Sequence, residues 1–407
     1  MDILPVLKEL FYAENMKFFD VKIDETSKKS FHMGSNLLFA KVSIIDEHEN
    51  AQEIPLAVKV GKTKQDSNMA SKGYRESVFF REIVPIFNKL QADLKTKNIF
   101  NKMPKCYKTL IKDGYEIIIL ENVSVSGWGA LDLSEFINAE GQEVIAKTTA
   151  QYHALSLALR HLDKETFEKH TKDFDMVNRE FVAGMIDIFQ DTLCKIENIL
   201  EESNKQETLL KFRKLLKTVD GQTMLKIIDD KPKEVVVVHG DLQRFNFMYK
   251  FKDKSCGSIA DAMLIDFQVA GIHSPAIDLT YYFFTSVHLP SYKASDFLES
   301  YHKHLTTSLK ELSCDVNKLF PYSTLIEHWN KYAFYGFCFA IAFMKLGFSE
   351  GALKQPSNDT IETVAEPEDI GKNIRDTIAN AKVTNNELYN HTLLNLTEKY
   401  LESTNIQ

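Results

Sequence analysis

The spacing of apolar residues changes once along this 407-residue chain, and that change constrains the fold more than any other feature. Up to about residue 120, short runs rich in apolar and β-branched residues are typical of strands. From Glu140 onward, most segments repeat their apolar residues about every 3.6 positions, as amphipathic helices do. Because the chain exceeds the usual length of one domain, we expect two packed lobes, one small and mixed, the other large and helical.

The first part is predicted to run strand, strand, helix, strand, strand, after a surface helix within Met1–Asp24. The pair Asp113-Gly114 favours a tight hairpin turn because both residues tolerate positive φ. Pro85 is expected to bend or divide the helix. The strands are predicted over Asn36–Ile45, Glu53–Val60, Cys106–Ile111 and Tyr115–Leu120, and the helix over Ala70–Leu90.

The second part is predicted to be mainly helical with one β-rich insertion. Helices are predicted over Gln142–Leu162, Phe174–Glu202 and Lys205–Leu216, the insertion over Glu234–Val238, Phe247–Phe251 and Ala262–Ile265, and a mobile loop over Gly351–Gly371. We therefore expect an α+β fold: an N-terminal lobe (residues 1–121) with an antiparallel sheet, a linker near Glu121–Ser126, and a mainly helical C-terminal lobe (residues 122–407).

Composition excludes several classes of protein. The formal net charge of −8 argues against general attraction to nucleic acid or to an anionic membrane. The longest apolar run, Ala333–Met344, is well short of the roughly 20 residues that a membrane helix needs. The five cysteines are odd in number and far apart, so we expect no disulfides and a reducing, cytoplasmic setting.

The strongest chemical signal is the segment Val238–Asn246 followed by Leu264–Gln268. Asp241 and Asn246 follow one buried strand, and Asp266 ends another, so all three oxygen-bearing side chains can meet in one cleft. Phosphoryl transfer needs such a set, because Mg²⁺ prefers hard oxygen ligands and a separate carboxylate must orient the attacking hydroxyl. Asp241 is predicted to be the base, and Asn246 and Asp266 the metal ligands.

An upstream lysine strengthens this interpretation. Lys59 lies in an apolar strand, where a lone ammonium group is costly unless it is paired. Its partner is predicted to be Glu76 or, as the weaker candidate, Glu82. Lys59 would then hold nucleotide phosphate oxygens, and the backbone of Gly34-Ser35-Asn36 would approach the same phosphates.

Structural alternatives exist for each residue. Asp241, Asn246 and Asp266 are also residue types that favour turns, and Lys59 can extend from a strand edge to water. His239 is better explained as a brace of the catalytic loop than as a proton shuttle, since Asp241 already supplies a base.

Taken together, these residues resemble the insect ecdysteroid kinase-like group, which belongs with the choline-kinase-like and aminoglycoside-phosphotransferase-like small-molecule kinases. The resemblance rests on His-Gly-Asp-x4-Asn, on Asp-Phe-Gln where protein kinases have Asp-Phe-Gly, and on Ser274–Leu279 and Glu76–Pro85. It implies a protein-kinase-like two-lobed fold, ATP with Mg²⁺, and phosphorylation of a hydroxyl on a small molecule such as an ecdysteroid. It also implies adenine contacts from the backbone at Glu121 and a structural role for Asp278.

The chain departs from the group's pattern at positions that bear on substrate. Leu37 and Phe39 replace an aromatic residue and a serine of the phosphate loop, and Gln243 replaces a common tryptophan. Gln268, in place of the glycine of protein kinases, should restrict flipping of Phe267 because positive φ is costly there.

Two alternatives therefore remain open: a catalytically weak protein that binds a lipophilic ligand, and a choline- or ethanolamine-type kinase. A protein-substrate kinase is disfavoured because no Ala-Pro-Glu follows Asp266.

Overall fold

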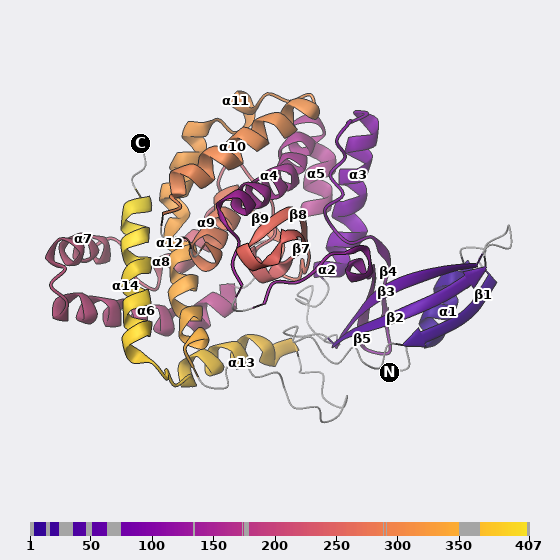
Figure 1. Cartoon of the computed structure of the whole chain (residues 1–407). Helices are drawn as coiled ribbons and strands as arrows, with labels where there is room; N and C mark the ends of the chain where they lie inside the picture. Colours follow the sequence, from indigo (N-terminus) through magenta and orange to yellow (C-terminus); the bar gives the residue numbers. More distant parts are fainter. Residues whose placement is uncertain are drawn as a thin grey trace.

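The computed structural model of the chain describes residues 4–13, 17–23, 36–45, 51–62, 75–132, 135–172, 174, 179–287, 289, 291–349 and 367–404. An antiparallel sheet with one helix lies at one end of the molecule and a large group of helices at the other (Figure 1). This is the mixed α+β arrangement that the change in apolar spacing predicts.

The sheet has five strands in the order β1-β2-β3-β5-β4, and all neighbours are antiparallel. Helix α1 (Leu4–Ala13) buries Val6, Leu7 and Leu10 in one apolar cluster with sheet residues. The strands are β1 (Lys17–Ile23), β2 (Asn36–Ile45), β3 (Ala51–Lys62), β4 (Cys106–Lys112) and β5 (Tyr115–Glu121).

The expectation of one helix across the N-terminus is wrong for residues 17–23. They form β1, an edge strand paired with β2. The run Phe19-Asp-Val-Lys-Ile23 alternates apolar and polar residues, which is a strand period, and pairing with β2 satisfies the backbone groups on its inner edge.

The hairpin between β4 and β5 turns at Asp113 and Gly114, whose φ angles are 53° and 76°. Positive φ at both central residues matches the right-handed twist of the flanking strands. The tight turn predicted from this pair is confirmed.

The helical segment after β3 is divided, as Pro85 predicts. It consists of α2 (Arg75–Val78), a π-helical turn over Phe79–Ile83 and α3 (Val84–Asp93), with Pro85 in the first turn of α3. Proline lacks an N–H and its ring displaces the carbonyl one turn back, so the hydrogen-bond ladder shifts before it.

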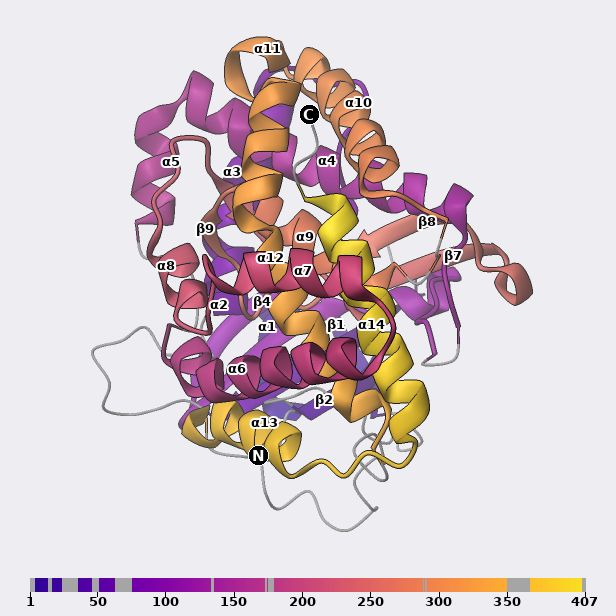
Figure 2. The same cartoon turned by 90° about the vertical axis from the view of Figure 1, so that its left-hand side faces the viewer.

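The remaining helices surround two short strand pairs, β6 with β9 and β7 with β8. Figure 2 shows α6, α7 and α14 on the end of the molecule away from the sheet. The helices are α4 (Ala139–Leu162), α5 (Lys164–Thr171), α6 (Arg179–Glu202), α7 (Gln206–Leu216), α8 (Thr223–Asp229), α9 (Pro275–Ser286), α10 (Ala294–Glu311), α11 (Val316–Leu319), α12 (Tyr322–Gly347), α13 (Pro367–Asn380) and α14 (Asn386–Ser403); the strands are β6 (Val236–Val238), β7 (Phe247–Asp253), β8 (Ser258–Leu264) and β9 (Gly271–His273).

Several boundaries differ from the predicted ones. Helix α6 begins at Arg179 rather than Phe174, whose carbonyl instead accepts a hydrogen bond from Ile272. Helix α13 begins at Pro367, inside the predicted loop 351–371, and residues 351–366 of that loop lie outside the described residues. The apolar run Ala333–Met344 lies within α12. In the part of the chain that the structure describes, no helix is long and apolar enough to cross a membrane.

The helical segment α2–α3 packs into the large core rather than the small one. Phe79, Phe80, Ile83 and Phe87 belong to the same apolar cluster as α4, α9 and α12. The cluster of α1 and the sheet is separate. This packing places α2 between the sheet and the catalytic loop, where the candidate site lies.

Candidate active site

The loop after β6 is held by its backbone. The carboxylate of Asp278, at the start of α9, accepts hydrogen bonds from the N–H of His239 (2.7 Å) and of Gly240 (2.9 Å). Gly240 has φ +82°, and a Cβ there would lie 2.2 Å from the carbonyl oxygen of Val269. Only glycine fits this position without a shift of backbone, and the loop therefore presents Asp241 in one fixed place.

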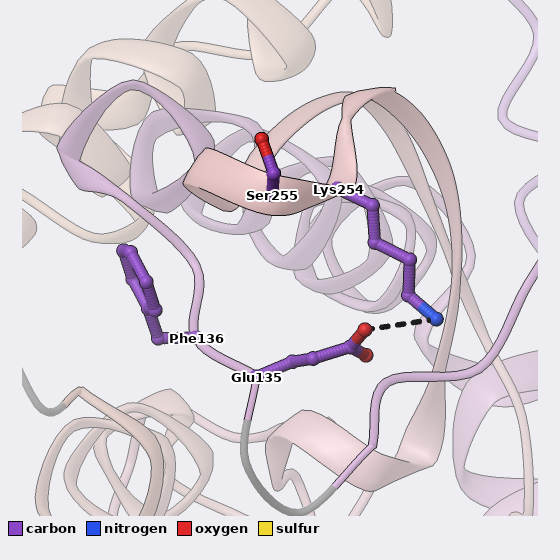
Figure 3. Close-up of a pocket in the computed structure, with 4 residues that line it drawn as sticks. All are labelled: Glu135, Phe136, Lys254 and Ser255. Atoms are coloured by element: carbon purple, nitrogen blue, oxygen red, sulfur yellow. Dashed lines mark ion pairs between the residues drawn. The ribbon is translucent and has the colours of Figure 1, made fainter.

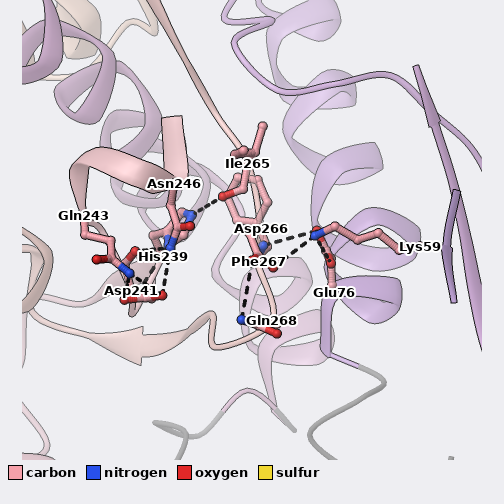
Figure 4. Close-up of polar contacts among 10 residues, drawn as sticks. All are labelled: Lys59, Glu76, His239, Asp241, Gln243, Asn246, Ile265, Asp266, Phe267 and Gln268. Carbon is pink, nitrogen blue, oxygen red and sulfur yellow. Dashed lines mark hydrogen bonds and ion pairs between the residues drawn. The ribbon is translucent and has the colours of Figure 1, made fainter. Parts of the chain in front are cut away.

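The side chain of Asp241 is surrounded by hydrogen-bond donors (Figure 4). The Nδ2 of Asn246 donates to Asp241 Oδ2 and to the Asp241 carbonyl oxygen, both at 2.8 Å. The Nε2 of Gln243 lies 3.2 Å from both carboxylate oxygens. The hydroxyl of Tyr281, on α9, lies close to the same carboxylate.

Burial raises the pKa of the Asp241 carboxyl above its ordinary value. Hydrogen bonds from Tyr281 and Asn246 and the nearness of His239 lower that pKa, whereas the charge of Asp266 raises it further. A carboxylate that is more basic than usual is better suited to accept a proton near neutral pH.

Asn246 and Asp266 are brought together by the pairing of β7 with β8. The N–H of Ile265 donates to the carbonyl oxygen of Asn246 at 3.1 Å, so the residue after Ile265 lies beside Asn246. Because both bonds from Asn246 Nδ2 go to Asp241, the Oδ1 of Asn246 is the atom left to act as an oxygen ligand. Asp266 adopts φ +69°, a left-handed conformation that is uncommon outside glycine and typical of functional sites.

Lys59 joins the sheet to this loop. Its Nζ lies 2.9 Å and 2.8 Å from the two carboxylate oxygens of Glu76 and 3.0 Å from Asp266 Oδ1. All three side chains are buried. Glu76 Oε1 also accepts a hydrogen bond from the N–H of Phe267 at 3.3 Å. Glu76 therefore contacts both Lys59 on β3 and the segment Asp266-Phe267-Gln268.

The charges in this group compensate one another. Burial alone would lower the pKa of Lys59, but the negative charges of Asp266 and Glu76 outweigh it and hold that pKa above the ordinary value. Burial raises the pKa of Glu76, the cation of Lys59 lowers it, and the charge of Asp266 raises it. One ammonium between two buried carboxylates leaves the group with a net negative charge that attracts a further cation.

Of the two glutamates considered for Lys59, only Glu76 contacts it among the residues that the structure describes. Glu82 instead lies 3.2 Å from Arg81 and 3.0 Å from His170 of α5. Glu76 lies on α2, whereas Glu82 lies within the π-helical turn Phe79–Ile83.

His239 braces the loop, as expected. Its Nε2 lies 2.9 Å from the carbonyl oxygen of Ile265, and its Nδ1 accepts the N–H of Asp241 at 3.4 Å. The ring also packs 4.8 Å from that of Phe267. With both nitrogens engaged by backbone groups, the imidazole joins the two chemical segments of the site.

The remaining predicted residues are Gly34, Ser35, Asn36 and Glu121. Gly34 and Ser35 lie outside the described residues, and Asn36 begins β2 opposite Val60. Glu121 ends β5, where its N–H donates to the carbonyl oxygen of Lys105 at 2.8 Å. Any adenine contact from Glu121 must therefore use its carbonyl oxygen.

Tyr281 is the contact that sequence reasoning missed. It lies one helical turn after Asp278 on α9, and residues three apart share a helix face. That spacing places Tyr281 on the side of α9 that meets the loop after β6, but neighbouring aromatic residues of α9 are equally buried, so the spacing alone does not identify it.

A cavity of about 280 Å³ lies elsewhere, between the segment before α4 and the turn of the β7–β8 hairpin (Figure 3). It is lined by Glu135, Phe136, Lys254 and Ser255, and the Lys254 ammonium pairs with Glu135 Oε1 at 3.0 Å. Arg244 donates to the Glu135 carbonyl. The cavity's charged groups neutralise each other, and none of the predicted site residues line it.

The donor set fits Mg²⁺. The described residues contain no group of three or more histidine, cysteine or acidic side chains placed to hold a metal by themselves. Mg²⁺ bound with nucleotide needs fewer protein ligands, because phosphate and water oxygens complete its shell. An amide oxygen of Asn246 and a carboxylate of Asp266 are hard ligands of the required kind.

Known proteins share sequence or structural similarity with this chain. The ecdysteroid kinase-like family profile matches residues 30–314. An ethanolamine kinase of Saccharomyces cerevisiae is 26% identical over 160 residues, and the match takes in 36% of this chain but only 29% of the yeast protein. The solved structure of an ethanolamine kinase from Plasmodium vivax aligns with 98% of this chain and 87% of that one, at 14% identity and a TM-score of 0.40.

Proposed function

The chain belongs to the ecdysteroid kinase-like family, and from this premise we propose that it is an ATP-dependent phosphotransferase acting on a hydroxyl group of a small molecule. The observation that carries the proposal is the meeting of Lys59, Glu76 and Asp266 beside Asp241 and Asn246 (Figure 4). These five side chains come from four separate segments, and turn propensity alone does not explain why they converge.

Each residue has a role that its surroundings support. Lys59, held by Glu76, would bind phosphate oxygens of ATP, and Asn246 with Asp266 would hold Mg²⁺. When bound, the metal supplies positive charge that neutralises the phosphates. Asp241 would orient the acceptor hydroxyl and take its proton. Catalysis would then consist of positioning and charge neutralisation.

The nucleotide's other contacts remain proposals of the same kind. The backbone at Gly34, Ser35 and Asn36 would approach the phosphates, and the Glu121 carbonyl would meet adenine. All five cysteines are free thiols, which suits a reducing compartment, and we propose that the protein is cytoplasmic.

For the acceptor we propose a lipophilic alcohol such as an ecdysteroid. Aromatic rings continue outward from the base: Tyr281 contacts Tyr335 (6.1 Å between centroids) and Phe339 (5.4 Å), and Phe339 stacks on Phe343 (5.8 Å). Apolar and aromatic surroundings with few polar groups are typical of sites for such ligands. The similarity to a yeast ethanolamine kinase favours a second candidate, a small amino alcohol.

The test is phosphorylation of a panel containing ecdysteroids, choline and ethanolamine with Mg-ATP, read by mass spectrometry. Asp241→Asn should lower kcat by about a hundredfold or more while the protein still binds Mg-ATP. Asp229→Asn is a matched control, because Asp229 makes only an exposed ion pair with Arg179. An Asp241→Asn protein with full turnover would contradict the proposal, whereas affinity without any product would indicate a binding protein.

A further inference from the structure

Donors from the chain itself crowd the carboxylate of Asp241. A carboxylate offers about four lone-pair positions. Gln243 Nε2 bonds both oxygens and Asn246 Nδ2 bonds Oδ2, and the Tyr281 hydroxyl, a third donor, lies close to the same group. An acceptor hydroxyl that is to donate its proton to Asp241 therefore competes with these donors for the carboxylate. This inference rests on the function proposed above.

Two of the donors are fixed. Asn246 is held at 2.8 Å by Asp241 Oδ2 and by the Asp241 carbonyl, so its amide cannot turn without losing both bonds. The ring of Tyr281 is only 5% exposed and is packed between aromatic neighbours on α12. Neither side chain can leave Asp241 without breaking up its packing.

Gln243 is the donor that can move. Its two contacts with Asp241 are longer, at 3.2 Å each, and its side chain is partly exposed. Equal distances to both oxygens place Nε2 on the plane that lies midway between them. This is a position from which a hydroxyl donor can reach either oxygen.

We propose that the Gln243 amide occupies the place of the acceptor's hydroxyl group. An acceptor displaces the amide from this place, but water does not. Gln243 is thus a specificity residue that suppresses wasteful hydrolysis of ATP. In that hydrolysis, a water oxygen bonds to the γ-phosphorus, the bond from that phosphorus to the bridging oxygen breaks, ADP leaves with the electron pair, and the water proton passes to Asp241. The Gln243 amide on the carboxylate disfavours this step, because water binds too weakly to displace it.

The experiment measures ADP release from Mg-ATP with water as the sole acceptor. Gln243→Ala should raise this rate about tenfold, since it frees a general base whose contribution is typically larger than that. Gln243→Met keeps the side-chain volume but removes the donor, and it should raise the rate in the same direction. Gln206→Ala, the same change at an exposed glutamine of α7, should leave the rate unaltered.

The proposal also requires that the added hydrolysis pass through Asp241, so Asp241→Asn in the Gln243→Ala background should abolish it. An unchanged or lower rate in folded Gln243 variants that still bind Mg-ATP would overturn the inference, and so would a rise that survives Asp241→Asn. Should Gln243→Ala fail to fold, the Gln243→Met rate decides. Failure of the wild-type protein to bind Mg-ATP in calorimetry would instead refute the kinase function itself.

Discussion

Phe79 and Phe267 lie face to face, with ring centroids 3.9 Å apart and ring planes 8° from parallel. Phe80 meets both rings edge-on, with its centroid 5.6 Å from that of Phe79 and 6.0 Å from that of Phe267. The stack holds the segment that carries Asp266 against the helix that carries Glu76. Aromatic contacts therefore position these two carboxylates together with the ion pairs of Lys59.

Truncation of this stack should destabilise the protein. Phe79 is fully buried, so Phe79→Ala should lower the free energy of unfolding by about 3–5 kcal/mol, measured by urea denaturation. Phe136→Ala is the control, because Phe136 is 42% exposed and its loss should change stability by no more than about 0.5 kcal/mol. Equal effects of the two substitutions would refute the role of the stack.

Phe267 should keep its position whether or not nucleotide is bound. Gln268 replaces the glycine that would ease a backbone flip, and the stack on Phe79 opposes one. Crystals grown with and without an ATP analogue provide the measurement. A form with Phe267 swung toward Lys59 would contradict the prediction.

Removal of the Lys59 charge should affect both stability and catalysis. Lys59→Met leaves the buried carboxylates of Glu76 and Asp266 without their cation, which should cost about 3–5 kcal/mol of stability. Lys59→Arg keeps the charge but not the shape, so turnover should stay low while much of the stability returns. Chemical denaturation measures the stability, and ADP release measures the turnover. Full turnover of Lys59→Arg would argue against a requirement for the compact lysine ammonium at the phosphates.

Glu116, on β5, should make stability depend on pH. Burial, aided by the charge of Glu76, raises its pKa from 4.5 to about 7, although Lys59 opposes the shift. Because the folded state binds the proton more tightly, the stabilisation is complete below pH 4.5 and is lost as pH rises through 7. Glu116→Gln should match wild type at pH 5 and be more stable at pH 8, by up to about 3 kcal/mol.

Thermal unfolding measured from pH 5 to pH 8 tests whether Glu116→Gln becomes more stable than wild type as the pH rises. Glu168→Gln is the control, since Glu168 is largely exposed on α5 and pairs only with Lys164. If Glu116→Gln destabilised the protein at pH 8, the carboxylate would have to be ionised and favourably paired there.

The charged residues of the site could be predicted because each of them is energetically unfavourable in its own local sequence. Lys59 in an apolar strand and two acids beside buried strands are costly unless they meet, so the sequence indicates that they do. The choice of Glu76 over Glu82 comes from the resemblance of Glu76–Pro85 to the family's pattern, and the contact of Glu76 with Lys59 agrees with it.

Other elements carry no local signal of their own. Strand β9 has only three residues, too few for a period, and it is extended because it pairs with β6. Tyr281 lies on a helix that is apolar on nearly every face, and periodicity cannot tell which buried aromatic residue turns its hydroxyl toward Asp241. Both depend on contacts between distant segments.

The packing of α2–α3 in the larger core has a mechanical consequence. Lys59 belongs to the sheet, whereas its partners Glu76 and Asp266 belong to the other part, so hinging between the two would lengthen both ion pairs. It would also disturb the packing of Ile118 and Leu120 of β5 in the larger core. Whatever draws the ammonium toward phosphate would thus also change how firmly the sheet is held to the rest of the molecule.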